Sequence, residues 1–280
     1  MDERLHRRRG AGLSFLMGGD GEPLLLLHGA PGSSQTWQKV GIKIASRFRI
    51  IIPDLMGFGA SDPPPDDGTS LEAYAKSIRV LLSYLQIESL YLGGHDFGAA
   101  VAVTLMRLYP EVNVRGLVLS ANNFFTDTQT PFPMSMARWP ILNNLFAWGM
   151  AGNRLGLRVL YESAAYNKED AVWRDFRHHL TGGGIRLTRR MMQHALTDFA
   201  HDNVALEAAL PELACPTLLL WGDDDPFLTV EAGERLLATL PDATLKVYAY
   251  TGHFVPEERP LECAEDIVLR FTDEPLIHKP

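Results

Sequence analysis

The stretch from Leu90 to Leu105, LYLGGHDFGAAVAVTL, limits the possible folds of this chain more than any other segment. A short aliphatic run ends at GGHDFG, residues 93–98. An alanine- and valine-rich run then continues to Tyr109, and Pro110 ends it because proline cannot extend a helix. The pattern predicts a strand, a sharp turn and a helix.

Asp96 stands at the centre of this turn, with Gly94 two residues before it and Gly98 two residues after it. Small residues at those places let a strand and a helix approach a strained turn closely. A carboxylate at a helix N-terminus stays ionised because it faces unpaired N–H groups and the positive end of the helix dipole. Asp96 is therefore a candidate nucleophile that needs no base to deprotonate it. The alternative interpretation is that Asp96 only caps the helix.

Length, charge and hydropathy narrow the class of protein. The 280 residues leave room for one large globular α/β domain and a smaller inserted one. The formal net charge of −8 provides no basic surface, so we expect neither nucleic acid nor an anionic membrane as a partner. No long apolar run exists, and the N-terminus, MDERLHRRRG, is charged. The pattern thus predicts no membrane span and no signal peptide, with the cytoplasm as the default location.

Cysteine and histidine usage gives no sign of a metal centre. The two cysteines, Cys215 and Cys263, are too few for a disulfide framework or a metal cluster. The nine histidines are scattered and show no paired spacing typical of zinc sites. We therefore expect no metal, and the sequence leaves open whether the chain forms a homodimer.

An uninterrupted apolar run, Leu24–Leu27, is typical of a strand buried on both faces of a parallel sheet. The run ends at HGAP, residues 28–31. A loop in this place can direct backbone N–H groups at a neighbouring turn, so the N–H of Ala30 is a candidate for half of an oxyanion hole. For His28 we favour a structural role in fixing the loop.

Strand and helix patterns alternate through the first part of the chain. Two short strands are expected within residues 1–22, and further strands at 49–54 and 114–119, with a helix at 70–86 before the Asp96 turn. This alternation predicts an α/β fold with a mostly parallel, doubly wound sheet.

The regular alternation stops after residue 120. Residues 121–205 carry no convincing strand and read as an inserted helical cap, between core segments 1–120 and 206–280. Its first sixty residues are rich in aromatic side chains, which suggests an apolar substrate pocket, although ordinary core packing explains at least half of them. These aromatic residues are Phe124, Phe125, Phe132, Trp139, Phe146, Trp148, Tyr161, Tyr166, Trp173 and Phe176.

Two late strands are each followed by a residue with catalytic chemistry. The run 217–221 precedes GDDDP, and after a helix at 230–239 the strand 244–250 precedes Thr251-Gly252-His253. The chain order is therefore nucleophile, acid, histidine, each at the carboxyl end of a strand. Such agreement between separate motifs favours a catalytic role for Asp96 over a purely capping one.

With these motifs the core resembles an α/β-hydrolase, and more narrowly the epoxide hydrolase and haloalkane dehalogenase branch, in which the nucleophile is aspartate. HGAP at 28–31 resembles the HGxP loop of epoxide hydrolases, and GHDFG at 94–98 resembles their GHDxG turn. The resemblance covers the whole core and is weak across the cap. It implies Asp96 as nucleophile, His253 as base and Asp225 as its orienting acid. It also implies an oxyanion hole formed by the N–H groups of Ala30 and Phe97.

The resemblance implies hydrolysis of an apolar epoxide to a vicinal diol, with water as the second substrate and no cofactor. Asp96 would form an alkyl ester, and water activated by His253 would cleave it. Related enzymes use two cap tyrosines to donate to the epoxide oxygen. This chain reads MQHA at 192–195, where the second tyrosine is usual, so His194 is a candidate donor. Tyr161 and Tyr166 are both candidates for the first.

Two other functions remain open. Haloalkane dehalogenases usually carry a tryptophan after the nucleophile and an asparagine in the HGxP loop, where this chain has Phe97 and Ala30. Fluoroacetate-type dehalogenases carry an arginine after the nucleophile, and it is absent as well. The remaining alternative is an esterase-like scaffold, similar to the serine hydrolases, with aspartate at the turn and weak or no activity.

Overall fold

One eight-stranded sheet runs through the described part of this computed structural model, which comprises residues 4–64, 69–128, 154–168 and 202–272. The strands are β1 (His6–Gly10), β2 (Leu13–Gly18), β3 (Glu22–Leu27), β4 (Phe48–Pro53), β5 (Ser89–His95), β6 (Asn113–Ser120), β7 (Thr217–Gly222) and β8 (Ala243–Tyr248). Their order in the sheet is β1-β2-β4-β3-β5-β6-β7-β8. β2 pairs antiparallel with β1 and with β4, and all other neighbours are parallel. The predicted fold class is confirmed.

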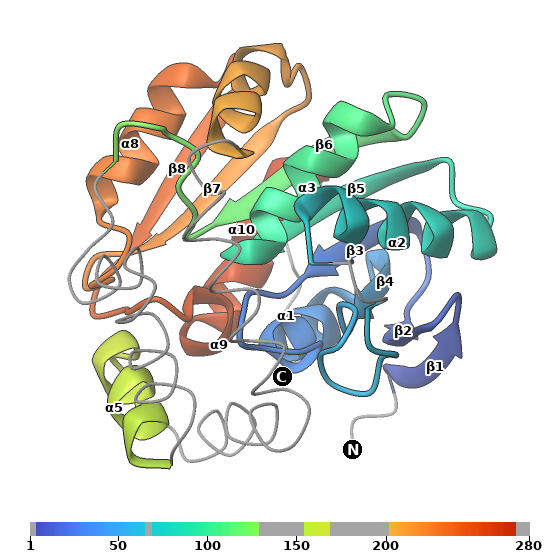
Figure 1. Ribbon diagram of the computed structural model, residues 1–280, viewed down its shortest axis with the longest axis horizontal. Helices are drawn as coiled ribbons and strands as arrows, with labels where there is room; N and C mark the ends of the chain where they lie inside the picture. The colour runs from blue at the N-terminus through green and yellow to red at the C-terminus, as the bar shows by residue number, and fades with distance from the viewer. Residues whose placement is uncertain (1–3, 65–68, 129–153, 169–201, 273–280) are drawn as a thin grey trace.

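Helices cover both faces of this sheet (Figure 1). They are α1 (Gln35–Ile44), α2 (Leu71–Tyr84), α3 (Phe97–Leu108), α8 (Val230–Thr239), α9 (Val255–Glu258) and α10 (Pro260–Phe271). A further helix, α5 (Arg154–Ala164), follows β6 in the chain. The helices α2, α3 and α8 pack on one face, and α1, α9 and α10 on the other. The chain is therefore doubly wound, as the alternation of strands and helices predicts.

Strand β3 shows why its four leucines are uninterrupted. Leu25 and Leu27 join the hydrophobic cluster under α2, α3 and α8, whereas Leu24 and Leu26 join the cluster under α1 and α10. Successive side chains of a strand point to opposite faces, so a strand covered on both sides needs apolar residues at every position. All four leucines are fully buried, and β3 occupies a central place in the sheet.

Strand β8 ends two residues earlier than the sequence pattern predicts. It stops at Tyr248, and Tyr250 has a positive φ of 56°, which a strand does not accommodate. The chain turns there toward Thr251 and His253. This early end lengthens the loop between the sheet and His253 by two residues.

The predicted helical cap falls largely outside the described residues. Within it the structure describes residues 121–128, α5 with the four residues that follow, and residues 202–205, which begin a helical segment that continues to residue 209 in the predicted core. Leu206 of that segment is buried in the core cluster. The predicted domain boundaries therefore stay a prediction. No helix within the described ranges has the length and hydropathy to cross a membrane.

The turn between β5 and α3 brings strand and helix into very close contact. A Cβ added to Gly94 would lie 2.4 Å from the backbone nitrogen of Ala99, and one added to Gly98 would lie 2.4 Å from the carbonyl oxygen of Leu27. Real Cβ atoms do not approach backbone atoms so closely. Glycine at both positions is therefore a steric requirement of this turn.

We expect Gly94→Ala to lower the free energy of unfolding by at least about 2 kcal/mol, because backbone must move to admit the methyl group. Gly41→Ala is the matched control. Its Cβ would meet only side-chain ends of Ile50 and Ile52 at 3.0 Å, and alanine gains up to about 1 kcal/mol of helix propensity over glycine. Urea unfolding of both variants measures the difference, and equal stabilities would contradict this account of the turn.

Candidate active site

Asp96 occupies a strained position at the carboxyl end of β5. Its φ and ψ are 49° and −122°, a region that costs a residue with a side chain about 1–3 kcal/mol. Neighbouring groups hold it there: its N–H donates to the carbonyl of Ser120 at 2.9 Å, and its carbonyl accepts from the side-chain amide of Asn122. Both partners lie at or just after the end of the adjacent strand β6. The sheet itself therefore stabilises the strained turn.

The carboxylate of Asp96 makes no capping hydrogen bond to helix α3. Instead, Oδ2 accepts a hydrogen bond of 2.9 Å from the N–H of Ala30. Oδ1 lies 3.9 Å from Nε2 of His253, and the Asp96 side chain is 29% exposed. The geometry thus argues against the simple capping role, since the carboxylate points at the predicted base and stays accessible.

Asp225 orients His253 from the other side. Its Oδ2 is 2.9 Å from Nδ1 of His253, and the Asp225 side chain is fully buried. The second carboxylate oxygen, Oδ1, accepts from the N–H groups of Phe227 and Leu228 at 2.9 and 3.1 Å. A buried carboxylate with all of these partners is fixed in place, so it sets the direction in which Nε2 points. Asp223 and Asp224, the other acids of this loop, are exposed.

The two carboxylates favour the charged form of the histidine. Burial works against the imidazolium, but the negative charges of Asp225 and Asp96 outweigh it and raise the pKa of His253 to about 9. Burial also opposes ionisation of Asp225, yet the adjacent His253 and the two amide donors hold its pKa below the usual value. The resting site at neutral pH therefore contains one imidazolium between two carboxylates.

The HGAP loop is fixed as the sequence predicts. His28 is fully buried, its Nε2 lies 2.9 Å from the backbone nitrogen of Leu55, and its Nδ1 lies 2.7 Å from the carbonyl of Gly29. Because the N–H of Leu55 must donate to Nε2, the proton of the neutral ring sits on Nδ1. A Cβ on Gly29 would lie 2.7 Å from Oδ2 of Asp96, so only glycine lets the loop approach the carboxylate.

Of the two predicted oxyanion-hole residues, Ala30 is the one whose N–H contacts Asp96. Phe97 follows Asp96 as the first residue of α3, and its ring packs edge-on against Tyr74 with centroids 5.1 Å apart. Both backbone N–H groups belong to segments that meet at Asp96. Their role as an oxyanion hole stays a prediction.

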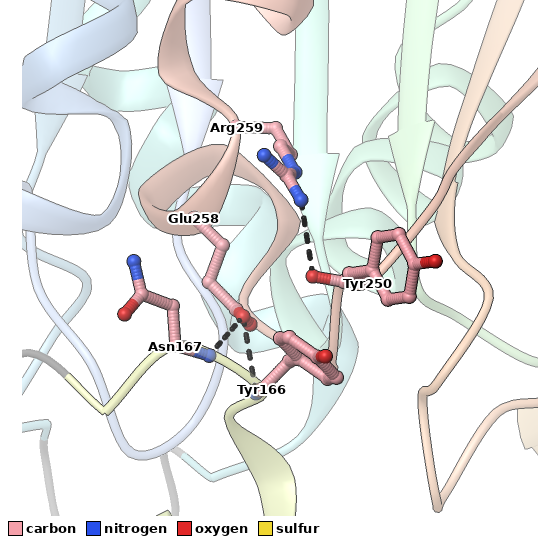
Figure 2. A pocket seen from close by; sticks show the side chains of 5 residues that line it. All are labelled: Tyr166, Asn167, Tyr250, Glu258 and Arg259. Carbon is pink, nitrogen blue, oxygen red and sulfur yellow. Dashed lines mark hydrogen bonds between the residues drawn. The ribbon is translucent and has the colours of Figure 1, made fainter.

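The three candidate cap donors differ in what the structure describes. Tyr161 on α5 is 2% exposed, and its ring stacks on Phe254 at 5.8 Å, next to His253. Tyr166 is 49% exposed and lies instead against Tyr250, beside a cavity of about 150 Å³ (Figure 2). His194 lies outside the described residues. The placement favours Tyr161 over Tyr166.

His95, which precedes the nucleophile, is a site residue that the motif analysis missed. Its ring is buried, and Nε2 lies 2.9 Å from the carbonyl of His253. Burial and the neighbouring His253 lower the pKa of His95 to about 4, so it is neutral and donates this hydrogen bond. Only its place beside Asp96 at the end of a strand could have indicated this contact.

Within the described ranges, no group of three or more metal-ligating side chains gathers.

Comparison with known proteins identifies the family. A model of the alpha/beta hydrolase fold matches residues 22–260. This chain belongs to that family. An uncharacterized protein of Mycobacterium tuberculosis is 30% identical over 273 residues, covering 93% of this chain and 78% of the relative. A haloalkane dehalogenase of Mycobacterium bovis is 26% identical over 267 residues, covering 90% and 89%.

Solved structures give the same fold for this α/β-hydrolase. The epoxide hydrolase CorEH, without ligand, superimposes with a TM-score of 0.77 at 23% identity and covers 95% of this chain and 98% of its own. The predicted α/β-hydrolase family is therefore confirmed, and an epoxide hydrolase and a haloalkane dehalogenase are among the proteins that this chain resembles.

We expect Asp225→Asn to lower the pKa of His253 by more than about one pH unit, because it removes the nearest negative charge. In the wild type the folded pKa of about 9 exceeds the unfolded value of 6.5. Protonation of His253 therefore adds to the free energy of unfolding. This contribution is complete below pH 6.5 and is lost as the pH rises through about 9. NMR titration of the imidazole measures the pKa. Asp224→Asn, an exposed acid of the same loop, should leave it unchanged, and equal effects of the two variants would disprove the assignment.

Proposed function

We propose that this α/β-hydrolase opens an apolar epoxide to a vicinal diol through a covalent ester on Asp96. The observation that carries the proposal is the accessible Asp96 carboxylate, 3.9 Å from a histidine that Asp225 holds in place. An aspartate in this position can attack a saturated carbon directly, and the histidine can then serve the second step. The enzyme class, a hydrolase, follows from the family.

In the first step Oδ1 of Asp96 attacks a ring carbon, and the bond from that carbon to the epoxide oxygen breaks. Oδ2, which accepts from Ala30, becomes the carbonyl oxygen of the new ester. The departing oxygen takes a proton from a donor above the site, for which the buried Tyr161 is our candidate. Aromatic rings surround this region: Phe227 and Phe254 both lie with ring centroids 5.5 Å from His253. Such walls favour an apolar substrate.

The second step depends on a change in the charge of His253. Esterification neutralises Asp96, one of the two carboxylates that favour the imidazolium. The pKa of His253 then falls, and the proton it releases restores the donor that protonated the epoxide oxygen. Neutral His253 accepts a proton from water, and the hydroxide attacks the ester carbonyl. The N–H groups of Ala30 and Phe97 stabilise the tetrahedral oxyanion, and its collapse releases the diol, the Asp96 carboxylate and protonated His253.

Haloalkane dehalogenation is the second candidate, favoured by the 26% identical dehalogenase relative. The same aspartate and histidine could serve it. The phenylalanine ring of Phe97 offers no N–H group to a departing halide, which favours the epoxide. Turnover of a panel of aryl and alkyl epoxides, haloalkanes and p-nitrophenyl esters separates these two candidates from the esterase-like alternative.

We expect His253→Gln to accumulate the ester, because alkylation needs only the carboxylate while hydrolysis needs the base. Intact-protein mass spectrometry after incubation with an epoxide should show a mass increase equal to the substrate, located on Asp96. Asp96→Ala is the control and should show neither turnover nor mass increase. A His253→Gln protein that neither turns over nor gains mass would remove His253 from this role.

We expect Tyr161→Phe to slow alkylation at least about tenfold, since a positioned proton donor commonly contributes about 10²–10⁴-fold. Hydrolysis of a preformed ester should change little. Tyr166→Phe is the matched control, because Tyr166 is half exposed and lies against Tyr250. Single-turnover kinetics measures both steps. Equal alkylation rates in the two variants would place the donor elsewhere, with His194 the next residue to test.

A further inference from the structure

The end of helix α5 lies directly against the loop that carries the base. We call residues 164–167 the α5 foot and residues 250–254 the histidine loop. The N–H of His253 donates to the carbonyl of Ala164 at 2.8 Å. A Cβ on Gly252 would lie 2.3 Å from that carbonyl oxygen and 2.7 Å from the nitrogen of Tyr166. The two backbones are in contact, and a side chain at position 252 would separate them.

Glu258, the last residue of α9, stabilises the contact between the α5 foot and the histidine loop. Its Oε2 accepts from the N–H of Tyr166 at 3.0 Å and from the N–H of Asn167 at 2.8 Å (Figure 2). A Cβ on Gly252 would lie 3.1 Å from Oε1 of the same carboxylate. One carboxylate therefore touches both the α5 foot and the histidine loop. Burial raises the pKa of the Glu258 carboxyl above its usual value, and the amide donors act against that rise because they bind the ionised form more strongly than the neutral one.

Arg259, the residue after Glu258, also binds the histidine loop. Arg259 donates from Nε to the hydroxyl of Thr251 at 2.8 Å and from Nη2 to the carbonyls of Ala249 and Tyr250. Its guanidinium is thus directed to the loop backbone, and Figure 2 shows the bond to Tyr250. Glu258 adds to the negative charges that raise the pKa of His253.

We propose that Glu258 is a positioning residue that holds the α5 foot on the histidine loop and keeps His253 aligned for hydrolysis of the ester. Tyr161 belongs to the same assembly, because its ring stacks on Phe254 one turn of helix before the foot. The carboxylate thus acts through two backbone amides and through its charge. The kinetic part rests on the proposed function, whereas the placement and protonation of His253 can be measured in the resting protein.

The resting protein separates the two contributions of Glu258. Glu258→Gln keeps an oxygen acceptor but removes the charge, and should lower the pKa of His253, by NMR titration, by at least about 0.3 pH unit. Glu258→Ala removes both, and should speed hydrogen exchange of the amides of Tyr166 and Asn167 at least about tenfold. Glu234→Gln, an exposed acid on α8, is the control and should change neither quantity.

Kinetics then tests the role in the reaction. In single-turnover experiments with an epoxide, Glu258→Ala should slow hydrolysis of the ester at least about tenfold, and alkylation by a smaller factor, because the stacking of Tyr161 on Phe254 does not involve Glu258. In Glu258→Gln, hydrolysis should approach the wild-type rate at high pH. Its midpoint should move to lower pH, because removing a negative charge favours the neutral histidine that activates water.

Different measurements test the role of Glu258 and the proposed function. An unchanged His253 titration in Glu258→Gln together with unchanged amide exchange in Glu258→Ala would overturn the positioning role. If Glu258→Ala does not fold, the titration and pH midpoint of Glu258→Gln decide it alone. If the wild type never gains mass on Asp96 with any epoxide or haloalkane, the proposed function fails, while NMR and exchange still decide the role of Glu258.

Discussion

The strained backbone of Asp96 is the constraint on which the rest of this structure depends. A positive φ at a residue with a side chain persists only where the surroundings compensate for it. Here the compensation comes from Ser120 and Asn122, at and just after the end of the adjacent strand, and from glycines at 94 and 98 that let α3 and β3 come close. The same turn lifts the carboxylate out of the helix cap and toward His253. The backbone strain of Asp96 and the accessibility of its carboxylate therefore have the same cause, the conformation of this turn.

The electrostatics of the site follow from the number of carboxylates around one histidine. With Asp96 and Asp225 both ionised, the imidazolium is favoured, and the resting base holds a proton that it must release before it can activate water. In the proposed reaction, ester formation on Asp96 would remove one negative charge when a base is needed. The proposed nucleophile would then change the protonation of His253 through its charge alone, while the buried Asp225 holds the ring in place.

The sequence allows the fold class and the order of strands and helices along the chain to be predicted, because these depend on local patterns. Leu24–Leu27 shows a strand covered on both faces, and Asp96, Asp225 and His253 each follow a strand. Other site residues act through partners far away in the chain: His95 contacts a carbonyl 158 positions later, and Glu258 binds an amide 92 positions earlier. Local sequence patterns do not reveal contacts between residues so far apart in the chain. The spacing of residues in the sequence also did not distinguish Tyr161 from Tyr166 as proton donors. In the structure their burial differs, because Tyr161 packs against Phe254.

The hydrogen bond between α5 and the backbone of His253 affects how the site would discriminate between substrates. Tyr161 lies on the same helix whose last carbonyl, at Ala164, accepts from the backbone of His253. A substrate that displaces the Tyr161 ring from Phe254 therefore acts on the helix that positions the base. Packed elements move as units because the interior is dense. If Tyr161 is the proton donor and His253 the base, a substrate that fits poorly would disturb both residues. It would then react more slowly in both chemical steps as well as bind less tightly.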